Sequence, residues 1–299
     1  MKILVTGGTV FASRFTAEYF VKKGHDVYVL NRNSRPQSDS VNLINCDRHN
    51  LGDTLKSYIF DLIIDVTAYN KNDIDDLING LGKFENYVMI SSSAVYPETL
   101  SQPFKEIYPT GENIHWGDYG TNKIAAEQVL LEKVPNAYIL RPPYLYGAMN
   151  NLYREAFVFE CAEKELPFYI PKDGKMPLQF FDIEDLCRFI EIIIDKKPSE
   201  HIFNVGNPQT IDINEWVRLC YNILDKTPEI RYVTDNINQR NYFSFLDYGY
   251  VLDVTKQQKL MPDVKPLEQG LKESYNRYKN NRELVRRKDF INYIKENFK

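Results

Sequence analysis

The amino-acid sequence predicts an α/β fold in which a doubly wound parallel sheet is interleaved with a smaller α+β lobe. The first indication is the alternation of short apolar runs with helical patterns through the first half of the chain, typical of strand–helix–strand units. The second is a change at Ala148, after which the pattern becomes mixed. Because no internal repeat or linker separates two consecutive domains, we expect the lobes to alternate along the chain.

The composition is that of an ordinary soluble globular protein. The 299 residues can form one large core or two modest lobes, with 43% apolar and 26% charged residues. The net charge of -4 gives no reason to expect nucleic acid or an anionic membrane as a partner. The apolar runs are short and Met1 leads directly into a strand without a signal-peptide layout, so we expect a cytoplasmic protein.

Cysteine and histidine are too scattered to indicate a metal site. The four cysteines include no Cys-x-x-Cys pair, which predicts reduced thiols, and the four histidines are isolated from one another in the sequence. We therefore expect no bound metal and no disulfide.

The N-terminal stretch predicts a strand, a glycine turn, a helix and a second strand. Residues 2–5 form an apolar strand, the turn 6–9 breaks it, and aromatic residues at helical spacing follow before a second strand at 25–30. Backbone amides of such a turn favour an anion, and a dinucleotide diphosphate is the ligand typical of this position. The expected cofactor contacts here are Thr6, Gly7, Gly8, Thr9, Val10 and Phe11.

The turn departs from the usual dinucleotide fingerprint at Val10 and Ser13, which replace its second and third glycines. Either the Val10 side chain turns away from the cofactor, or the phosphate contact is looser. At the end of the second strand, Asn31 is followed by Arg32 and Arg35 rather than by an acid. Arginine suits a ribose 2′-phosphate, so the sequence favours NADP over NAD, unless Arg32 stacks on adenine or is an ordinary surface residue.

Polar and small side chains also follow the next two predicted strands, at 41–45 and 61–66. Ligands bind at the carboxyl ends of strands in open parallel sheets, so these residues can contact the adenine and ribose of a cofactor, although helix capping explains each of them equally well. The residues concerned are Asp47, Arg48, Thr67, Ala68 and Tyr69.

The strongest candidate for chemistry is Tyr119-Gly-Thr-Asn-Lys123, on a predicted helix. Residues four apart share a helix face, and a nearby ammonium group favours the phenolate that a general base needs. The spacing alone means little, because Tyr19 with Lys23 and Tyr275 with Lys279 repeat it. What singles out Tyr119 is that a strand at 87–90, ending in serine hydroxyls at 91–93, precedes its helix.

In this order of motifs the chain resembles the extended short-chain dehydrogenase/reductase family, in particular its NAD(P)-dependent nucleotide-sugar epimerases and dehydratases. The matching stretches are Val5-Thr-Gly-Gly-Thr-Val-Phe11, Ser91-Ser-Ser-Ala-Val-Tyr96, Tyr119-Gly-Thr-Asn-Lys-Ile-Ala-Ala-Glu127, Leu140-Arg-Pro-Pro-Tyr-Leu-Tyr-Gly147, Phe181-Asp-Ile-Glu-Asp-Leu186, Phe203-Asn-Val-Gly206 and Leu252-Asp-Val-Thr-Lys256. They cover nearly the whole length. The resemblance implies a Rossmann-like sheet, a bound NAD(P) and a smaller lobe that closes over the substrate.

The resemblance also assigns roles to residues. Ser92 matches the catalytic hydroxyl, Tyr119 the general base, and Lys123 the residue that binds the nicotinamide ribose and lowers the tyrosine pKa. The backbone after Arg141 would hold the nicotinamide carboxamide. The further cofactor contacts that we expect are Ser91, Tyr119, Lys123, Pro142, Tyr144 and Leu145, and the expected substrate contacts are Ser93, Tyr96, Arg231 and Arg240.

The residues after Ser92 argue against some branches of the family. The 4,6-dehydratases have an Asp-Glu pair there and the epimerising reductases a cysteine, whereas this chain has Ser93 and Ala94. The resemblance is best to 4-epimerases, which act through a 4-keto intermediate, with a sugar-nucleotide reductase or dehydrogenase as the near alternative. The Thr-Gly-Gly-Thr-x-Phe turn also resembles an atypical subgroup related to chloroplast RNA-binding stem-loop proteins, so a non-catalytic NAD(P)- or RNA-binding protein remains a further alternative.

By family analogy we divide the chain between two lobes and expect a homodimer through helices beside the sheet. The NAD(P)-binding part is 1–147, with returns at about 177–206 and 246–256. The substrate-binding lobe is about 148–176, 207–245 and 257–299, ending in a charged helical tail from 282 that docks by one face.

Overall fold

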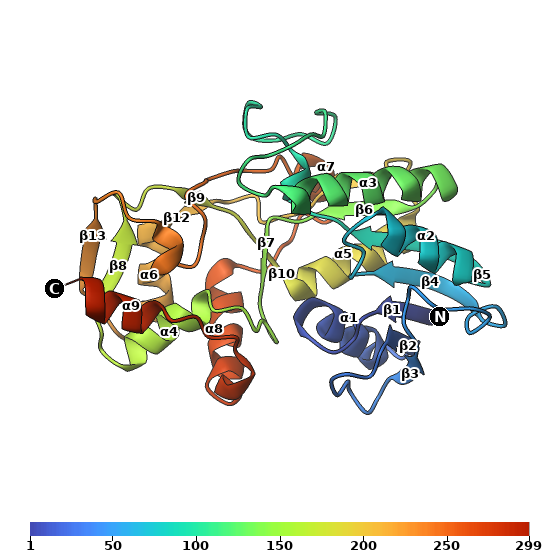
Figure 1. Cartoon of the computed structure of the whole chain (residues 1–299), viewed down its shortest axis with the longest axis horizontal. Helices are drawn as coiled ribbons and strands as arrows, with labels where there is room; N and C mark the ends of the chain where they lie inside the picture. Colours follow the sequence, from blue (N-terminus) through green and yellow to red (C-terminus); the bar gives the residue numbers. More distant parts are fainter. Residues whose placement is uncertain (299) are drawn as a thin grey trace.

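The computed structural model describes residues 1–298 as an elongated molecule with two lobes (Figure 1). The N-terminal lobe contains the large sheet and its helices, and the smaller second lobe holds the C-terminal helix. None of the helices in this range has both the length and the apolar character needed to span a bilayer.

Seven parallel strands form the large sheet, in the order β11-β6-β5-β4-β1-β2-β3. The order reverses between β1 and β4, so the predicted doubly wound parallel sheet is confirmed. Ile3, Leu4 and Val5 have no exposed surface, as expected for a strand covered on both faces. The strands are β1 (Lys2–Thr6), β2 (Asp26–Asn31), β3 (Asn42–Asn45), β4 (Ile59–Asp65), β5 (Lys83–Ile90), β6 (Tyr138–Arg141) and β11 (Ile202–Asn204).

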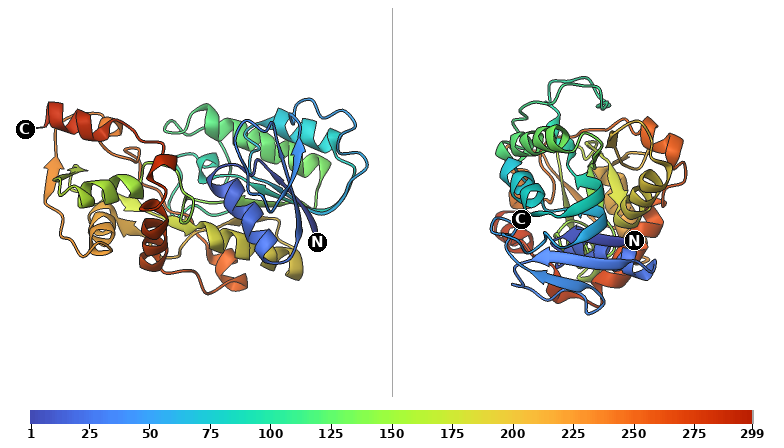
Figure 2. Two further views of the ribbon diagram at one scale, coloured as in Figure 1. Left: turned by 90° about the horizontal axis from the view of Figure 1, so that it is seen from below. Right: turned by 90° about the vertical axis from the view of Figure 1, so that its right-hand side faces the viewer.

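Helices cover both faces of this sheet. Helices α1 (Phe11–Lys22) and α5 (Ile183–Lys196) pack together on one face, and α2 (Lys71–Gly80) and α3 (Asp118–Lys133) on the other (Figure 2). Each layer has its own apolar core against the sheet. Helix α7 (Thr255–Leu260) lies beside β11 and α5, so a late part of the chain returns to the N-terminal lobe.

The second lobe is built around an aromatic core that includes Phe157, Phe168, Trp216 and Phe243. The strand pair β7 (Tyr144–Tyr146) and β10 (Phe180–Asp182) links the lobes, and their residues pack on the cores of both. The other elements of this lobe are α4 (Glu155–Glu163), β8 (Phe168–Pro171), β9 (Pro177–Leu178), β12 (Ile211–Asp212), α6 (Ile213–Asn222), β13 (Ile230–Val233), α8 (Leu267–Tyr278) and α9 (Phe290–Asn297). The short 3-10 helices of the chain are η1 (Ser93–Val95), η2 (Gln239–Asn241) and η3 (Arg282–Leu284).

The segment after residue 281 differs from the predicted continuous helical tail. Only α9 is α-helical, and its apolar residues pack on the second-lobe core as the helical spacing predicted. Before it, residues 285–289 are irregular: the backbone amide of Arg286 donates to the Asn151 carbonyl at 2.9 Å, and Arg286 alone pairs with Leu152 as a parallel bridge. Lys299 lies outside the described residues. The charged stretch was predicted to be helical throughout. The prediction was wrong because the loop that this stretch pairs with, residues 150–152, is far away in the sequence.

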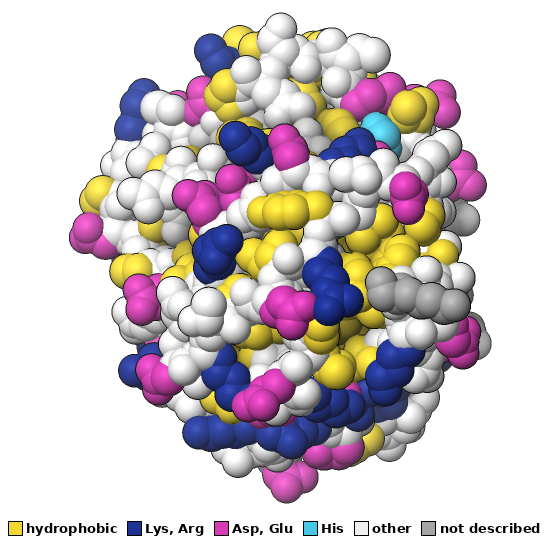
Figure 3. Space-filling view, turned by 90° about the vertical axis from the view of Figure 1, so that its left-hand side faces the viewer, with side chains coloured by type: hydrophobic (Ala, Val, Ile, Leu, Met, Phe, Trp, Pro, Cys, Tyr) yellow, Lys and Arg dark blue, Asp and Glu magenta, His cyan; other side chains and the backbone are white. Residues whose placement is uncertain are grey.

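The end of the second lobe farthest from the large sheet carries charges of both signs around apolar side chains (Figure 3). This end includes β13, where Arg231 forms an ion pair with Glu229 at 2.7 Å. Such a mixed surface is ordinary for a soluble protein.

Candidate active site

A cleft of about 690 Å³ opens at the carboxyl ends of the large sheet's strands. It lies where β1 and β4 diverge, the position at which open parallel sheets bind ligands. Its walls come from the glycine turn, the ends of β2, β4 and β5, helix α3, the stretch after β6, and two segments of the second lobe. The lining residues are Gly7, Thr9, Val10, Phe11, Ala12, Ser13, Arg32, Ser34, Arg35, Val66, Thr67, Tyr69, Ile90, Ser91, Ser92, Tyr119, Lys123, Pro142, Pro143, Leu145, Asn151, Leu152, Arg154 and Arg286.

The glycine turn leaves room and amides for an anion. Gly7 has φ +91°, and a Cβ there would lie 2.9 Å from the Ser13 hydroxyl oxygen, so only glycine fits. Val10 precedes α1 without a side-chain cap, which leaves the first amides of a 12-residue helix free beside the cleft. Ser13 is buried, and its hydroxyl donates to the Val10 carbonyl at 3.1 Å. The turn therefore fits a dinucleotide diphosphate despite its missing glycines.

Several residues predicted to touch the cofactor support the turn instead of lining the cleft. The Thr6 hydroxyl donates to Asp65 at 2.7 Å and accepts from the amides of Val66 and Thr67. The Asn31 amide donates to the Gly7 carbonyl at 2.7 Å. Gly8 packs against Val29 so closely that a Cβ would lie 2.5 Å from that side chain. Their role in this structure is to fix the loop that a cofactor would contact.

The prediction for Arg48 is corrected by a buried ion-pair network. Its guanidinium donates to Asp65 at 2.8 Å and to the Asp73 carbonyl at 2.8 Å, and it does not line the cleft. Burial alone would raise the pKa of Asp65, but the charge and hydrogen bonds of Arg48 outweigh it and lower that pKa. Asp47 is outside the cleft lining too, and pairs with Arg32 at 3.7 Å. An arginine at a strand end gives the same sequence pattern whether its side chain contacts a ligand or a buried carboxylate. The sequence therefore could not distinguish the two cases.

The three predicted catalytic side chains meet at the floor of the cleft. Ser92 begins η1, and its hydroxyl accepts from the Ala94 amide at 3.2 Å. Tyr119 keeps 40% of its surface exposed. Lys123 is almost fully buried, and its ammonium donates to the carbonyls of Ala68 at 2.7 Å and Ile90 at 2.9 Å. Ala68 therefore positions the lysine, while Ser91, at the end of β5, lines the cleft beside it.

The electrostatics of the pair differ from the expectation that Lys123 lowers the pKa of Tyr119. Burial raises the pKa of the Tyr119 phenol, and the groups that act against burial are the Ser92 hydroxyl and the positive charge of Arg154. Burial also lowers the pKa of Lys123 to about 8, against the opposing fields of Asp65 and Glu127. The cation that favours the Tyr119 phenolate in this structure thus comes from the second lobe.

Helix α3 is held in place by a buried network on its own face. Gly120 lies against η1, where a Cβ would be 2.5 Å from the Ala94 carbonyl oxygen. Two turns after Tyr119, Glu127 accepts from Arg141 at 2.5 and 3.0 Å and from the Ser91 hydroxyl. The network joins α3 to the ends of β5 and β6, so it fixes the relative positions of Ser92 and Tyr119.

The two other Tyr-x-x-x-Lys pairs have structural contacts only. The Tyr19 hydroxyl donates to Glu191 at 2.5 Å, and that of Tyr275 to Glu163 at 3.2 Å. Their lysines lie 5.2 and 5.8 Å from the tyrosine ring centroids. Neither pair lines the cleft.

The four predicted substrate contacts lie in different environments. Tyr96 is buried, donates to Asn204 and accepts from Arg141, each at 2.8 Å, so its role is structural. Arg231 is on the outer strand β13 with Glu229, away from the cleft, because its strand pairs with β8 rather than facing the sheet. Ser93 is buried next to the cleft. Only Arg240 reaches a cavity that adjoins it.

That adjoining cavity, of about 420 Å³, brings together cations that the sequence did not single out. Arg154 and Arg286 line both it and the cleft, Arg240 and Lys288 line it too, and none of its lining residues is acidic. Burial lowers the pKa of Lys288, and the charges of Arg240 and Arg154 lower it further. Tyr144, predicted to touch the cofactor, lines this cavity, with Arg154 over its ring at 5.2 Å. Mutually repelling cations without a carboxylate indicate an anion site.

Comparison with known proteins places this geometry in a family. A model of the NAD dependent epimerase/dehydratase family matches residues 3–206. The chain is 26% identical over 302 residues to the chloroplast stem-loop binding protein of 41 kDa b of Arabidopsis thaliana, covering 92% of this chain and 78% of that protein. It is 23% identical over 214 residues to a trifunctional UDP-glucose 4,6-dehydratase/epimerase/reductase of the same plant, covering 68% of this chain and 30% of that protein.

Solved structures share the fold at low identity. A dTDP-glucose 4,6-dehydratase from Bacillus anthracis, in complex with NAD, superposes with a TM-score of 0.76 at 19% identity, covering 95% of this chain and 98% of that chain. A UDP-glucose 4-epimerase from Thermotoga maritima, with UDP-glucose, gives 0.74 at 18%, covering 94% and 99%. The predicted resemblance is confirmed by the match over most of the chain and by this shared fold: the protein belongs to the NAD dependent epimerase/dehydratase family.

Proposed function

We propose that the protein is an NAD(P)-dependent enzyme that acts on a nucleotide-activated sugar, with 4-epimerase chemistry through a 4-keto intermediate. The observation that carries the proposal is the position of Ser92, Tyr119 and Lys123 at the floor of a cleft whose adjoining cavity is lined by four cations. A hydroxyl, a phenol and an ammonium group supply proton transfer, and the cations supply a site for the substrate's diphosphate.

The residues present fit a nicotinamide dinucleotide. Gly7 and the uncapped start of α1 offer amides to the diphosphate, Thr67 and Tyr69 line the ribose side, and Pro142 and Leu145 line the far end. When bound there, the nicotinamide would accept a hydride from the sugar and return it. Lys123, whose ammonium already bridges two carbonyls, would orient the adjoining ribose.

Tyr119 and Ser92 carry out the proton chemistry in this proposal. The Tyr119 phenolate takes the proton from the sugar hydroxyl and becomes the phenol, and the Ser92 hydroxyl donates to the same sugar oxygen as it becomes a carbonyl. Because burial raises the Tyr119 pKa, the positive charge of Arg154 is needed to make the phenol an effective base. Arg154 thus links the substrate lobe to the catalytic floor.

Epimerisation is favoured over dehydration because the positions after Ser92 lack an acid–base pair. Ser93 and Ala94 are both buried in η1 and carry no carboxyl group to eliminate water. A reductase or dehydrogenase, which stops at or starts from the ketone, is the alternative that uses the same three residues.

The direct test is turnover of nucleotide-sugars by the purified protein. Incubation with UDP-glucose or UDP-galactose and NAD or NADP should interconvert the C4 configuration, which NMR of the sugar reports. Formation of a ketone or alcohol product would favour the alternative reductase. No turnover on a panel of nucleotide-sugars with either cofactor would count against an enzyme of this class.

For the cofactor we propose a preference for NADP. Arg32 and Arg35 are both exposed at the cleft, and neither position after β2 is occupied by an acid that could accept from a ribose hydroxyl. Arg32→Ala should lower the ratio of NADP to NAD affinity by about tenfold, as expected for loss of a charge-assisted contact. An unchanged ratio would contradict the preference.

A second candidate function is binding of a nucleic-acid stem-loop. It is favoured by the similarity, over 92% of the chain, to a chloroplast stem-loop binding protein. Against it, the cations gather in one cavity beside the cleft, and the net charge is -4. Fluorescence titration with an RNA stem-loop distinguishes the two, because phosphate-backbone binding weakens steeply with added salt.

We also propose, by analogy with the family, a cytoplasmic homodimer formed through α2 and α3. Size-exclusion chromatography with light scattering tests the mass in solution. A substitution on the exposed side of α3, such as Gln128→Arg, should shift a dimer of this kind toward monomer.

A further inference from the structure

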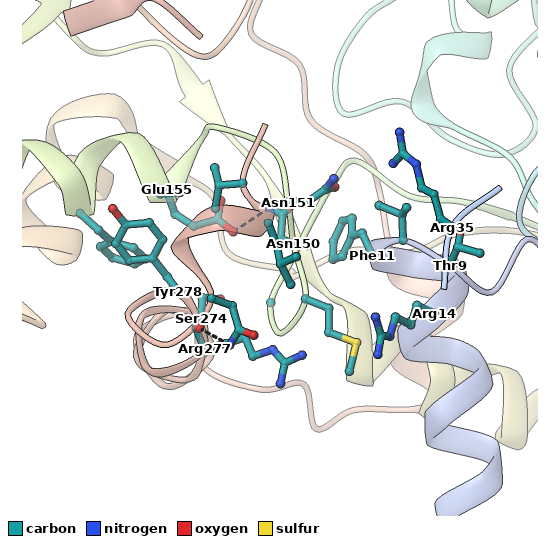
Figure 4. Close-up of a pocket in the computed structure, with 18 of the residues that line it drawn as sticks. Thr9, Phe11, Arg14, Arg35, Asn150, Asn151, Glu155, Ser274, Arg277 and Tyr278 are labelled. Atoms are coloured by element: carbon teal, nitrogen blue, oxygen red, sulfur yellow. Dashed lines mark hydrogen bonds between the residues drawn. The ribbon is translucent and has the colours of Figure 1, made fainter. Parts of the chain in front are cut away.

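A second, smaller cavity of about 200 Å³ lies between the lobes, apart from the catalytic floor. One wall comes from α1 and the turn before it, with Phe11 and Arg14; the other comes from α4 and α8, with Glu155 and Arg277 (Figure 4). It shares residues 9–11, Arg35 and Asn151 with the cleft but contains none of the three catalytic side chains.

Three buried polar atoms of the lining residues lack a hydrogen-bond partner among the described residues, and one of them is the Tyr278 hydroxyl. Glu155 is only 4% exposed; its Oε1 accepts from the Asn150 side-chain amide at 2.7 Å, and its Oε2 has no partner in the described residues. The Nε of Arg277 is likewise buried and without one. Since buried polar groups in folded proteins are normally hydrogen-bonded, each atom indicates a missing partner inside the cavity.

The charges around the cavity are mainly positive. Arg14 is paired with Glu18 at 2.9 Å, whereas Arg35 and Arg277 have no carboxylate within ion-pair distance among residues 1–298. Glu155 is the only acidic residue in the lining, and burial raises the pKa of its carboxyl group. The cavity therefore favours an anionic group near Arg277 and a hydrogen-bond donor near Glu155.

The rest of the lining is apolar. Phe11, Met149, Phe159, Leu284 and Val285 make up much of the wall. A water molecule takes about 30 Å³ of liquid volume and needs two to four polar partners, so this cavity is too large and too apolar for one bridging water. It is smaller than the roughly 300 Å³ at which pockets for drug-sized ligands begin.

We propose that this cavity is a second ligand site, for a small amphipathic anion: a carboxylate held by Arg277, a compact apolar body between Phe11 and Phe159, and a hydroxyl that donates to Glu155. The inference does not depend on the proposed sugar chemistry. Its test measures binding alone.

The probe is 4-hydroxyphenylacetate, which has all three features. Its binding to the full chain is measured by isothermal titration calorimetry. We expect one site per chain. Phenylacetate, which lacks the hydroxyl, should bind more weakly; tyramine, which replaces the carboxylate by an ammonium group, and inorganic phosphate, which has no apolar body, should not compete.

Two variants of the lining, a matched control and one substitute variant locate the site. Arg277→Ala should weaken the probe about tenfold or more, as expected for loss of a charged hydrogen bond. The matched control Arg218→Ala removes an exposed arginine of α6 and should change nothing. Ala156→Leu fills the cavity without removing a charge and should abolish binding; if it does not fold, Glu155→Gln, which keeps the side chain's shape, should weaken 4-hydroxyphenylacetate more than phenylacetate.

Three results would overturn the proposal. The first is no heat of binding at millimolar probe, which would mean that solvent fills the cavity. The second is equal affinity in wild type, Arg277→Ala and the cavity or Glu155 variant. The third is displacement of the probe by NADP together with no effect of Arg277→Ala, which would place the probe in the catalytic cleft.

Discussion

The floor and the cationic side of the active-site cleft are built in different ways. On the floor, Ser92, Tyr119 and Lys123 come from consecutive elements, and a buried network through Glu127 and Arg141 fixes them. On the cationic side, Arg154, Arg240, Arg286 and Lys288 come from three stretches far apart in sequence and are joined only by tertiary contacts. We infer that the sheet positions the catalytic side chains, whereas the docking of the second lobe sets the choice of substrate and brings the charge of Arg154 close to Tyr119.

The largest expected effect falls on the floor. Tyr119→Phe removes the proposed base without changing the ring, so kcat for sugar turnover should fall by about 10²- to 10⁴-fold while cofactor affinity stays the same. Steady-state kinetics and a cofactor titration give the two values. If the variant keeps a kcat near that of the wild type, Tyr119 is not the base and the floor does not carry the chemistry.

Whether the buried network supports the floor can be tested by measuring the free energy of unfolding. Glu127→Gln leaves Arg141 buried without its counter-charge and should cost about 3–5 kcal/mol of unfolding free energy in urea titration. The control is Glu85→Gln, which breaks an exposed pair with Lys197 and should cost below about 1 kcal/mol. Equal costs would show that the buried network does not support the floor.

On the cationic side, two neighbouring arginines provide a matched pair. Arg286 lines the cleft, whereas Arg287 turns away to Glu160 at 3.0 Å. Arg286→Ala should raise KM for the nucleotide-sugar by about 10- to 100-fold, the value of a charged hydrogen bond, and should change the cofactor affinity less. Arg287→Ala should leave both unchanged. If the two variants behave alike, the cations do not select the substrate.

The smallest effect concerns pH. Burial lowers the pKa of Lys123 from its ordinary 10.5 to about 8, so above pH 8 the unfolded state binds more protons at this site than the folded state. Stability from this group is therefore lowest below pH 8 and rises as pH increases toward 10.5. Relative to Lys123→Met, the wild type should gain about 1 kcal/mol between pH 8 and pH 9 in urea unfolding. A flat difference would mean that Lys123 is not desolvated.

Sequence reasoning predicted the floor better than the cationic side, for a physical reason. Position at a strand end and helical spacing are local signals. They were enough to predict that Ser92 lies near Tyr119 and that the glycine turn lines the cleft. Arg48 and Tyr96 carried the same local signals, but a buried partner from another strand, Asp65 or Asn204, takes each side chain away from the ligand. Local pattern does not reveal which partner a side chain finds.

In the second lobe, local sequence patterns predicted one segment correctly and missed the pairing of the segment before it. Helix spacing correctly placed the apolar residues of α9 on the core. It gave no sign that Arg286 would pair with Leu152, because that pairing depends on a loop more than a hundred residues earlier. Arg286 and Lys288 therefore were not among the predicted site residues.

The pairing of Leu152 with Arg286 also has a consequence for biosynthesis. The strands of the large sheet and all three floor residues have left the ribosome once the chain passes residue 204, so the cofactor half can form early. The cationic side cannot be complete until residue 288 has emerged. Ribosome-bound chains stalled between these two points should be able to hold a dinucleotide while still unable to select a sugar.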